Sequence, residues 1–297
     1  MLIIKVMGGL GNQLQQYALY EKLRHIGREV KLDIGWYEEK GVHGTEREFE
    51  LSRFDGLLYE CCSKEERDKI LKKSRTLSQR LWRKVKPDGG VVWEENVMYK
   101  PEIFQWEDKY LIGYWACEKY YADIMSYLRE KLVFPLSQDV RNMQAVQQME
   151  RECSIAVHIR RGDYLDECNA GMFGGICTEN YYKAAIQYVE KNVENPHFYF
   201  FSDDIDYVRQ QFRMTNSTYV DWNTGNDSFH DMYLMSHCKH NICANSTFSI
   251  WGARLNGHKG AVKIRPLKHK NSQNVSEKEM KEYWNGWILI DERGRTV

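Results

Sequence analysis

The sequence predicts an α/β protein made of two domains, each built around a mostly parallel sheet. Short apolar runs alternate with segments in which apolar residues recur at helical spacing, which is typical of βα units. The same pattern starts again near residue 150, and 297 residues are enough for two medium-sized cores. We therefore expect an N-terminal domain over residues 1–150, a C-terminal domain over residues 151–297, and a cleft between them.

The first domain opens with a strand, a glycine turn and a helix. Gly8, Gly9 and Gly11 directly follow the first apolar run, and Gly27 ends the helix that comes next. Residues 36–56 are irregular and rich in charge. The expected elements, in chain order, are a strand over 2–6, a helix from Leu14 to Ile26, strands over 30–34 and 110–115, and a helix over 120–132.

The second domain repeats the alternation without an internal sequence repeat. Gly171 to Gly175 predict a glycine-rich loop, and the tail after Pro266 is polar. The expected elements are strands over 154–159, 197–201, 218–221, 240–244 and 261–264, and helices over 179–193, 228–237 and 248–256.

Residues 64–86 form a basic segment with ten Lys or Arg and three acids. Its apolar residues, among them Ile70, Leu77 and Trp82, lie roughly on one helical face. Such a helix can rest on an anionic membrane surface, or it can pack its apolar side on its own domain. The sequence leaves both open.

Composition excludes several classes of protein. The formal net charge is zero, which argues against a nucleic-acid binder. The eight cysteines form no Cys-x-x-Cys pair, and a chain of this size needs no disulfides, so we expect reduced thiols and a cytoplasmic location. Neither a signal peptide nor a run of about 18 apolar residues is present.

The segment from Val157 to Tyr164 is the most informative motif. Arg160 and Arg161 come directly after the predicted buried strand, and the chain turns at Gly162. The carboxyl end of a strand is where α/β folds bind ligands, and two guanidinium forks match a pyrophosphate. The alternative is an ordinary surface pair between an arginine and Asp163.

The glycine turn after the first strand is a second candidate site. It lacks the Lys of a phosphate-binding P-loop, and Leu14 occupies the third glycine position of the dinucleotide fingerprint. Gly9 and Gly11 let the backbone approach a ligand, while Asn12 and Gln13 can hydrogen-bond a sugar or a phosphate. A plain tight turn explains the motif equally well.

Ser202, Asp203 and Asp204 follow the next strand of the second domain. An aspartate here can accept hydrogen bonds from ribose hydroxyls or an amine, or it can cap the following helix. Asp204 and Asp206 also have the spacing of a metal-binding pair in some sugar transferases. Because residues two apart on a helix do not share a face, we expect no metal site.

The last candidates lie at two predicted helix starts. Asp231 opens one helix, and a carboxylate suits the N1–H and N2 amine of guanine. Backbone amides and hydroxyls of Asn245, Ser246, Thr247 and Phe248, at the start of the next helix, favour a base or a phosphate. Helix capping by Ser246 or Thr247 is the competing explanation.

Together these motifs resemble the α-1,2-fucosyltransferase family, glycosyltransferase family 11, over nearly the whole chain. The resemblance departs at Gln15, where an aromatic residue is more common, and at Ile250, where tryptophan is common. It rests on six stretches: residues 8–14, 113–115, 158–164, 201–204, 231–236 and 244–249.

The resemblance implies a GT-B-like fold with two Rossmann-like domains facing a cleft. It implies inverting transfer of L-fucose from GDP-β-L-fucose to the 2-hydroxyl of a terminal β-galactose, without a metal or any cofactor. The natural acceptors would be lipid-linked O-antigen or capsule repeats, which would bring the enzyme to the inner membrane. A fucosyltransferase of another linkage, a non-catalytic sugar- or nucleotide-binding module and a nucleotide-dependent oxidoreductase are the alternatives.

The resemblance also implies roles for individual residues. Arg160 would stabilise the charge on the leaving GDP, and His158 and Asp163 are two candidates for the general base. The expected substrate-binding residues are Gly9, Gly11, Asn12 and Gln13 toward the sugar and acceptor, and Arg161, Ser202, Asp203, Asp231, Asn245, Ser246, Thr247 and Phe248 toward the donor.

Overall fold

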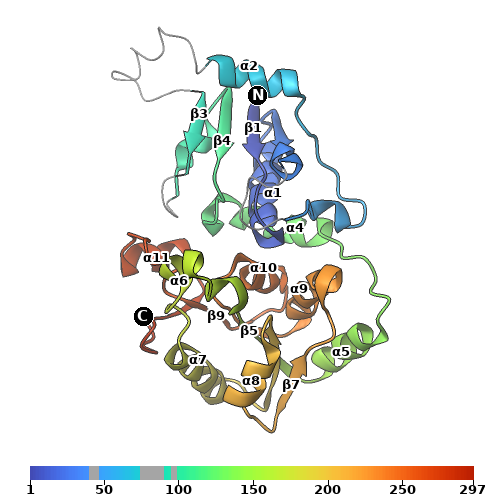
Figure 1. Ribbon diagram of the computed structural model, residues 1–297, viewed down its shortest axis with the longest axis vertical. Helices are drawn as coiled ribbons and strands as arrows, with labels where there is room; N and C mark the ends of the chain where they lie inside the picture. Colours follow the sequence, from blue (N-terminus) through green and yellow to red (C-terminus); the bar gives the residue numbers. More distant parts are fainter. Residues whose placement is uncertain (40–46, 74–89, 95–98) are drawn as a thin grey trace. The chain divides into compact units, whose positions relative to one another are not determined.

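The computed structural model describes residues 1–39, 47–73, 90–94 and 99–297 of the protein (Figure 1). The chain forms two compact units, an N-terminal unit over Met1–Val133 and a C-terminal unit over Phe134–Val297. Each unit holds a parallel sheet, so the predicted α/β class with a Rossmann-like domain in each half is confirmed. The cleft between the domains stays a prediction.

The division falls before residue 150 because helix α5 (Val140–Arg151) packs in the C-terminal unit. Its buried residues Ala145 and Met149 share a core with Leu234 of helix α9 (Phe229–His237). The sequence pattern places this stretch at the end of the first domain, over residues 1–150. Its apolar side instead completes the second.

The sheet of the N-terminal unit has the order β2-β1-β4-β3, with all neighbours parallel. The short strand β3 was not predicted, since its three residues carry too weak a pattern. The strands are β1 (Leu2–Lys5), β2 (Val30–Asp33), β3 (Val91–Trp93) and β4 (Lys109–Ile112).

Helix α1 (Leu10–His25) follows β1 and is buried along most of its length. The predicted helix over 120–132 is broken, because Tyr121 has φ −143° and ψ 12° and leaves the helical conformation. Only its last part, α4 (Met125–Lys131), is an α-helix. The remaining pieces are short 3-10 turns: η1 (Gly35–Glu38), η2 (Leu51–Arg53), η3 (Pro101–Phe104), η4 (Glu118–Tyr120) and η5 (Ala122–Ile124).

Helix α2 (Lys64–Lys73) is the described part of the basic segment, and it rests on the unit's own sheet. Ile70 is buried against Ile3 and Tyr110. Arg67 pairs with Asp33 at 3.6 Å. Residues 74–86 lie outside the described residues, so contact with a membrane stays a prediction. In the described part of the chain, no helix has the length and apolar character needed to cross a bilayer.

The sheet of the C-terminal unit has the order β10-β9-β8-β5-β6-β7, again with parallel neighbours. Its strands are β5 (Cys153–Ile159), β6 (Pro196–Ser202), β7 (Ser217–Val220), β8 (His240–Ile242), β9 (Lys263–Pro266) and β10 (Ile288–Ile290). Besides α5 and α9, its helical segments are η6 (Gly162–Tyr164), α6 (Glu167–Phe173), α7 (Glu179–Asn192), α8 (Ile205–Gln211), η7 (Gly225–Asp227), α10 (Thr247–Leu255) and α11 (Glu277–Tyr283).

Helices cover both faces of this sheet. Ile155 and Val157 of β5 pack with Tyr181 and Tyr182 of α7 on one face. Because successive side chains of a strand point to opposite faces, Ala156 packs on the other face, in a core with residues of α5 and α9. The result is a doubly wound sheet with its core on both sides of β5 and β6.

Two segments differ from the prediction. Helix α6 includes the first three residues of the predicted glycine-rich loop, Gly171 to Phe173, so this part of the prediction is wrong, and the polar tail contains α11 and the edge strand β10. Helix α11 begins with a capping box between Ser276 and Glu279, a local signal that the sequence analysis missed. Ile290 of β10 is buried, although β10 is only three residues long.

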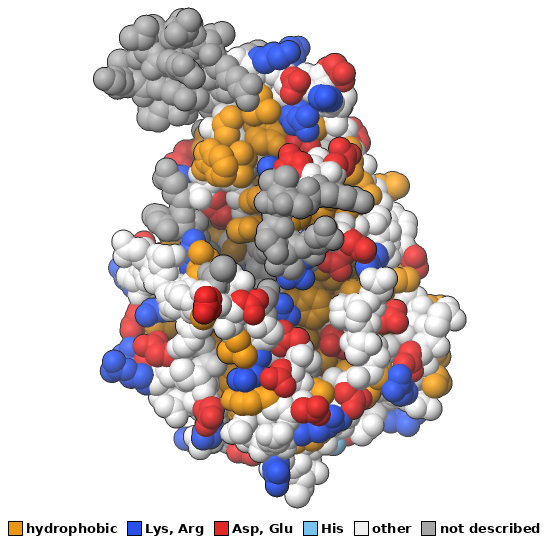
Figure 2. Space-filling view, in the orientation of Figure 1, with side chains coloured by type: hydrophobic (Ala, Val, Ile, Leu, Met, Phe, Trp, Pro, Cys, Tyr) orange, Lys and Arg blue, Asp and Glu red, His pale blue; other side chains and the backbone are white. Residues whose placement is uncertain are grey.

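The strand orders locate a switch point in each sheet. In the C-terminal unit the chain runs from β5 outward to β6 and β7, and then returns to β8 on the other side of β5. Parallel sheets bind ligands outside the carboxyl ends of the strands at such a point. Acidic and basic side chains are mixed over the visible face of this unit (Figure 2), so the ligand-binding position is indicated by topology and not by a patch of one charge.

Candidate functional site

Arg160 and Arg161 follow β5 directly and therefore lie at the switch point of the C-terminal unit. The Arg160 guanidinium is 2.9 Å from Asp203, which follows β6, and both side chains are about a quarter exposed (25%). The backbone N–H of Arg161 donates to the same carboxylate at 2.9 Å. A Cβ on Gly162 would collide with the Asp203 carboxylate, so a larger residue in this turn would displace the partner of Arg160.

The side chain of Arg161 is held by helix α8. Its Nε donates to Asp204 at 3.0 Å, and its guanidinium lies 3.5 Å from the centroid of the Tyr207 ring. Asp204 at the same time caps α8 by accepting from the Tyr207 N–H. Arg161 is therefore tied to the start of α8, whereas Arg160 is tied to Asp203 at the switch point, and the two arginine side chains are about equally exposed.

The loop between β8 and α10 flanks the other side of the switch point. Tyr164, in the turn after Arg161, donates its hydroxyl to the Asn245 carbonyl at 3.0 Å and joins the two loops. The Asn245 side chain is 2% exposed and donates to the carbonyls of Phe173 and His269. We interpret Asn245 as the anchor of this loop rather than as a ligand of the substrate.

Ser246 is the N-cap of α10, and its hydroxyl accepts from the Phe248 N–H at 3.4 Å. The first turn of α10 carries no acidic residue, so the partial positive charge of this helix end is available to an anion. Thr247 and Phe248 are partly buried in this turn. These residues remain where the sequence placed them, at a helix start beside the arginine loop.

His158 lies on β5 just before the arginines and is 6% exposed. Its Nδ1 has no hydrogen-bond partner in the described part of the chain. Burial, and then the charge of Arg160, lower the pKa of His158 to about 3. A histidine with this pKa is neutral near pH 7 and accepts a proton poorly, which disfavours it as the general base. The side chain of Asp163 lies outside what the structure describes.

The residues after β6 are used within the protein. The Ser202 hydroxyl accepts from the Asp204 N–H at 3.0 Å. Asp206 pairs with Arg209 at 3.3 Å. In the part of the chain that the structure describes, no three His, Cys, Asp or Glu side chains are grouped as metal ligands would be.

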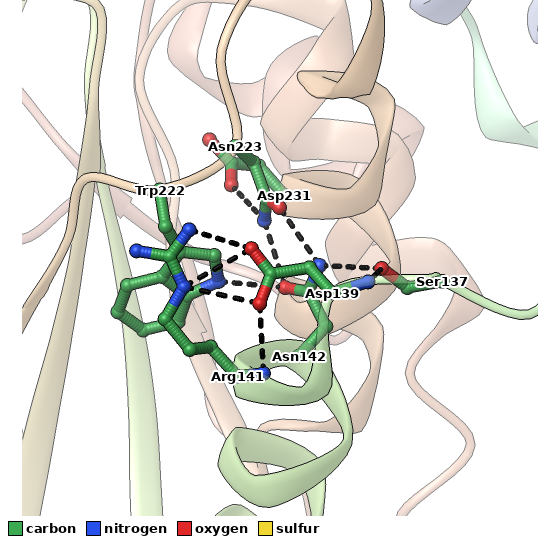
Figure 3. A network of polar contacts seen from close by, with 7 residues as sticks. All are labelled: Ser137, Asp139, Arg141, Asn142, Trp222, Asn223 and Asp231. Atoms are coloured by element: carbon green, nitrogen blue, oxygen red, sulfur yellow. Dashed lines mark hydrogen bonds and ion pairs between the residues drawn. The ribbon is translucent and has the colours of Figure 1, made fainter.

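Asp231 lies in the first turn of α9, half-buried. Its Oδ1 accepts a hydrogen bond from Asn223 at 2.9 Å (Figure 3). Burial raises the pKa of Asp231 to about 7, and the hydrogen bond from Asn223 opposes this shift. The sequence analysis had singled out Asp231 but not Asn223, which follows a short strand and belongs to no motif.

In the N-terminal unit, Gly9 is the N-cap of α1 in an extended conformation, Gly11 is buried and Asn12 is half-buried. Gln13 is fully buried and makes four hydrogen bonds to backbone groups, namely to the carbonyls of Gly8 and Glu48 and from the N–H groups of Glu50 and Leu51. These bonds occupy both groups of its amide. Gln13 therefore fixes the loop rather than facing a sugar.

Two further residues shape this edge. Glu50 accepts from the Leu10 N–H at 3.0 Å, and burial raises the pKa of this carboxyl group. Gln16 accepts from the Met7 N–H and donates to the Gly113 carbonyl, joining the ends of β1 and β4 at the switch point of this sheet. Neither residue was predicted as a site residue. Gln16 lies within the pattern of a helix, and Glu50 lies in a stretch without a regular pattern.

Fold and site together define an α/β protein in which an arginine paired with an aspartate and a helix start lie at one switch point. Residues 91–291 match the model of glycosyl transferase family 11, and the chain belongs to this family. It is a glycosyltransferase.

Two relatives from Escherichia coli span nearly the whole chain. One is an alpha-1,2-colitosyltransferase that is 29% identical, and the match covers 89% of this chain and 91% of the relative's chain. The other is the O-antigen biosynthesis glycosyltransferase WbnK, 30% identical over 94% of this chain and 98% of its own. Among solved structures, a mutant of Arabidopsis thaliana FUT1 in complex with GDP has a TM-score of 0.48 and 13% identity, covering 90% of this chain and 71% of that chain.

Proposed function

We propose that this glycosyltransferase transfers L-fucose from GDP-β-L-fucose to the 2-hydroxyl of a terminal β-galactose, with inversion and without a metal. The observation that carries the proposal is the position of Arg160 at the switch point, joined through Tyr164 to the loop that starts α10. The family and the names of the two bacterial relatives support the reaction class.

The donor diphosphate is proposed to bind between Arg160 and the first turn of α10. As the bond between the anomeric carbon and the β-phosphate breaks, negative charge grows on GDP. Arg160 stabilises this charge, and the helix start contributes its partial positive charge. Asp203 orients the guanidinium before the donor binds. Asp231, Ser246 and Thr247 are the proposed guanosine ligands.

The acceptor hydroxyl attacks the anomeric carbon from the face opposite GDP, so a β-linked donor gives an α-linked product. A general base takes the hydroxyl proton. Of the two candidates we favour Asp163, because the buried, neutral His158 is a poor proton acceptor. Asn12, at the carboxyl edge of the N-terminal sheet, is the remaining candidate for contact with the acceptor.

We further infer that the acceptor is a lipid-linked O-antigen or capsule repeat ending in β-galactose. The match with WbnK covers 98% of the length of WbnK, and its name as an O-antigen biosynthesis enzyme supports this class of glycan. Such an acceptor would bring the enzyme to the cytoplasmic side of the inner membrane, where the basic segment over residues 64–86 could contact anionic lipid.

The decisive experiment incubates the purified protein with GDP-fucose and a panel of β-galactosides, and determines the product linkage by NMR. Formation of an α-1,2-fucoside is the expected result. Binding of GDP-fucose without acceptor-dependent release of GDP would identify a non-catalytic module instead.

A second donor has support of its own, because one relative is named a colitosyltransferase. Colitose is fucose without the 3-hydroxyl group, so GDP-colitose belongs in the same assay. A kcat/KM that is much higher for GDP-colitose would replace fucose by colitose in the proposal and leave the inverting mechanism intact.

A further inference from the structure

The Asp231 carboxylate lies at the end of a chain of amide groups (Figure 3). Asn223 donates to Asp231, and Asn223 and Asn142 exchange two hydrogen bonds of 2.8 and 2.9 Å. Trp222 donates its indole N–H to Asn142 Oδ1 at 2.8 Å. Within the described residues, no other hydrogen bond to the Asp231 carboxylate is found.

The indole group of Trp222 sets the direction of this chain. An indole nitrogen can only donate, so the atom of Asn142 that faces it must be the carbonyl oxygen. The Asn142 amide nitrogen must then donate to Asn223 Oδ1, and it also donates to Ser137 at 2.8 Å. Asn223 is left with its own amide nitrogen toward Asp231. A donor in this position favours the ionised carboxylate.

The chain of amides is anchored on both sides. The Arg141 guanidinium lies 5.8 Å from the Trp222 ring and pairs with Asp139 at 2.6 Å. Phe134 stacks on Phe229, the first residue of α9, at 6.3 Å and 8°. The segment that leads into α5 is therefore packed against the helix that carries Asp231, and the amides have little freedom to rotate.

The first turn of α9 also lies beside the start of α10. A Cβ on Gly252 would lie 2.7 Å from Met235, so the two helices pack in close contact there. Both helices lead away from the carboxyl edge of the same parallel sheet. Asp231 precedes Met235 by four residues, and Phe248 precedes Gly252 by four residues, which is about one helical turn in each case. Asp231 is thus placed on the same edge as the proposed nucleotide loop.

We propose that Asn223, oriented by Asn142 and Trp222, is a positioning residue that keeps Asp231 ionised and directs its second oxygen at the guanine base of the donor. This inference rests on the proposed function. Guanine presents an N1–H and an N2 amine to a carboxylate, whereas hypoxanthine lacks the amine.

The surroundings of Asp231 predict how binding depends on pH. The charged or titratable groups near this network in the sequence are Asp139 and Arg141 at the start of α5, His230 on α9 and Asp227 in η7, while the first turn of α10 has none. Further along the same helices lie Glu150 and Arg151 of α5 and Tyr233 and His237 of α9. Because burial raises the pKa of Asp231 to about 7, the carboxylate forms above this pH and is lost below it. The midpoint of the pH dependence of binding should therefore lie near the pKa of Asp231. Loss of the hydrogen bond donated by Asn223 raises this pKa, and the midpoint moves to higher pH.

The test measures the Kd of GDP-fucose by calorimetry without acceptor, from about pH 5.5 to about pH 8.5, a range in which the esterified diphosphate does not titrate. Wild-type protein should bind more weakly as the pH falls through 7. Asn223→Ala should raise the midpoint by about one pH unit and weaken binding roughly fivefold at pH 7, with recovery at higher pH. It should also discriminate less between GDP and IDP.

Trp222→Phe keeps an aromatic ring at this position but removes the indole N–H donor, so it should shift the midpoint in the same direction by a smaller amount. Asn216→Ala removes an amide that donates to the Pro196 carbonyl elsewhere in the unit, and should leave the midpoint unchanged. If Asn223→Ala does not fold, the midpoint measured for Trp222→Phe decides: a midpoint equal to that of the wild type would overturn the positioning role.

The outcomes separate this inference from the proposed function. A wild-type protein that does not bind GDP-fucose would overturn the proposed function. Binding by the wild type with no dependence on pH near 7, or equal weakening by Asn223→Ala at every pH, would overturn only the positioning role.

Discussion

Two neighbouring arginines of one motif have different surroundings. Arg161 is bonded to Asp204 and stacked on Tyr207, so its charge is used to fix the start of α8. Arg160 pairs with Asp203 at the switch point, and both arginine side chains are about a quarter exposed. The two arginines therefore differ in the carboxylate and the ring that hold them rather than in exposure.

We predict that Arg160→Ala lowers kcat by about 10²- to 10³-fold with little change in thermal stability, because it removes a charge that stabilises the leaving diphosphate. Arg160→Lys keeps the charge but not the planar fork, and should give an intermediate rate. Arg209→Ala, which removes an exposed arginine of α8, is the matched control. Steady-state kinetics with GDP-fucose checks this prediction, and full activity of Arg160→Ala would remove the arginine from the mechanism.

At this scale, sequence patterns predicted where the candidate residues lie in the fold better than they predicted the contacts of those residues. Arg160, Asp203 and Asp231 lie at one sheet edge, as expected from their positions after strands and at helix starts. The patterns could not show that the side-chain amides of Gln13 and Asn245 are hydrogen-bonded to backbone carbonyls, because these carbonyls are distant in the sequence. Amide side chains bind backbone and ligands with the same atoms, so only the fold distinguishes the two uses.

At the scale of elements, the loop between β8 and α10 is held from several directions. Asn245 connects it to the carbonyls of Phe173 and His269, and Tyr164 connects it to the arginine loop. Cys177 also exchanges hydrogen bonds with Asn245. The helix start at Ser246 therefore depends on a buried polar cluster rather than on its own sequence.

We predict that Asn245→Ala lowers the free energy of unfolding by about 2–3 kcal/mol, because buried carbonyl groups lose their donors. The KM for the donor should rise as the loop loosens. Asn192→Ala, which removes an exposed amide bonded to the Tyr188 carbonyl, should change neither quantity. Denaturant unfolding and donor kinetics measure both effects, and a loss of affinity without a loss of stability would identify Asn245 as a direct ligand.

The predicted and the missed elements differ in length and patterning. Strands β1 and β5 and helices α1 and α7 were predicted, because each has a long apolar run or a clear helical period. Strands β3 and β10 have three residues each, too few for a period. Helix α5 has a buried face of only Asn142, Ala145 and Met149, and its polar Asn142 makes that face hard to recognise.

At the scale of the whole molecule, the two carboxylates with the spacing of a metal-binding pair are engaged elsewhere. Asp204 caps α8 and binds Arg161, and Asp206 pairs with Arg209. The positive charge at the switch point comes from Arg160 and the start of α10 instead. This arrangement suits a transferase that stabilises its leaving group with protein charges.

We therefore predict that excess EDTA leaves the transfer rate unchanged and that added Mg²⁺ or Mn²⁺ does not raise it. The measurement is the initial rate of GDP release at saturating acceptor, before and after dialysis against chelator. A rate that is lost on chelation and restored only by a divalent ion would return Asp204 and Asp206 to the mechanism.

Two buried groups of the C-terminal unit have opposite effects on how stability depends on pH. The pKa of His158 is about 3 in the fold and about 6.5 in an unfolded chain, so the unfolded state binds more protons as the pH falls below 6.5 and stability decreases. The pKa of Asp231 is about 7 in the fold and near 3.8 when unfolded, so stability increases as the pH falls from 7. In the wild type these two effects largely offset each other between pH 7 and pH 5.

We predict that separate variants uncover these two contributions. His158→Gln should remove a cost of about 2 kcal/mol at pH 5, so its unfolding free energy should rise, relative to wild type, between pH 7 and pH 5. Asp231→Asn should show the reverse, losing about 2 kcal/mol relative to wild type over the same interval. His25→Gln, at an exposed position on α1, is the control. Urea unfolding at the two pH values measures the differences, and equal changes in all three variants would mean that neither buried group carries its shifted pKa.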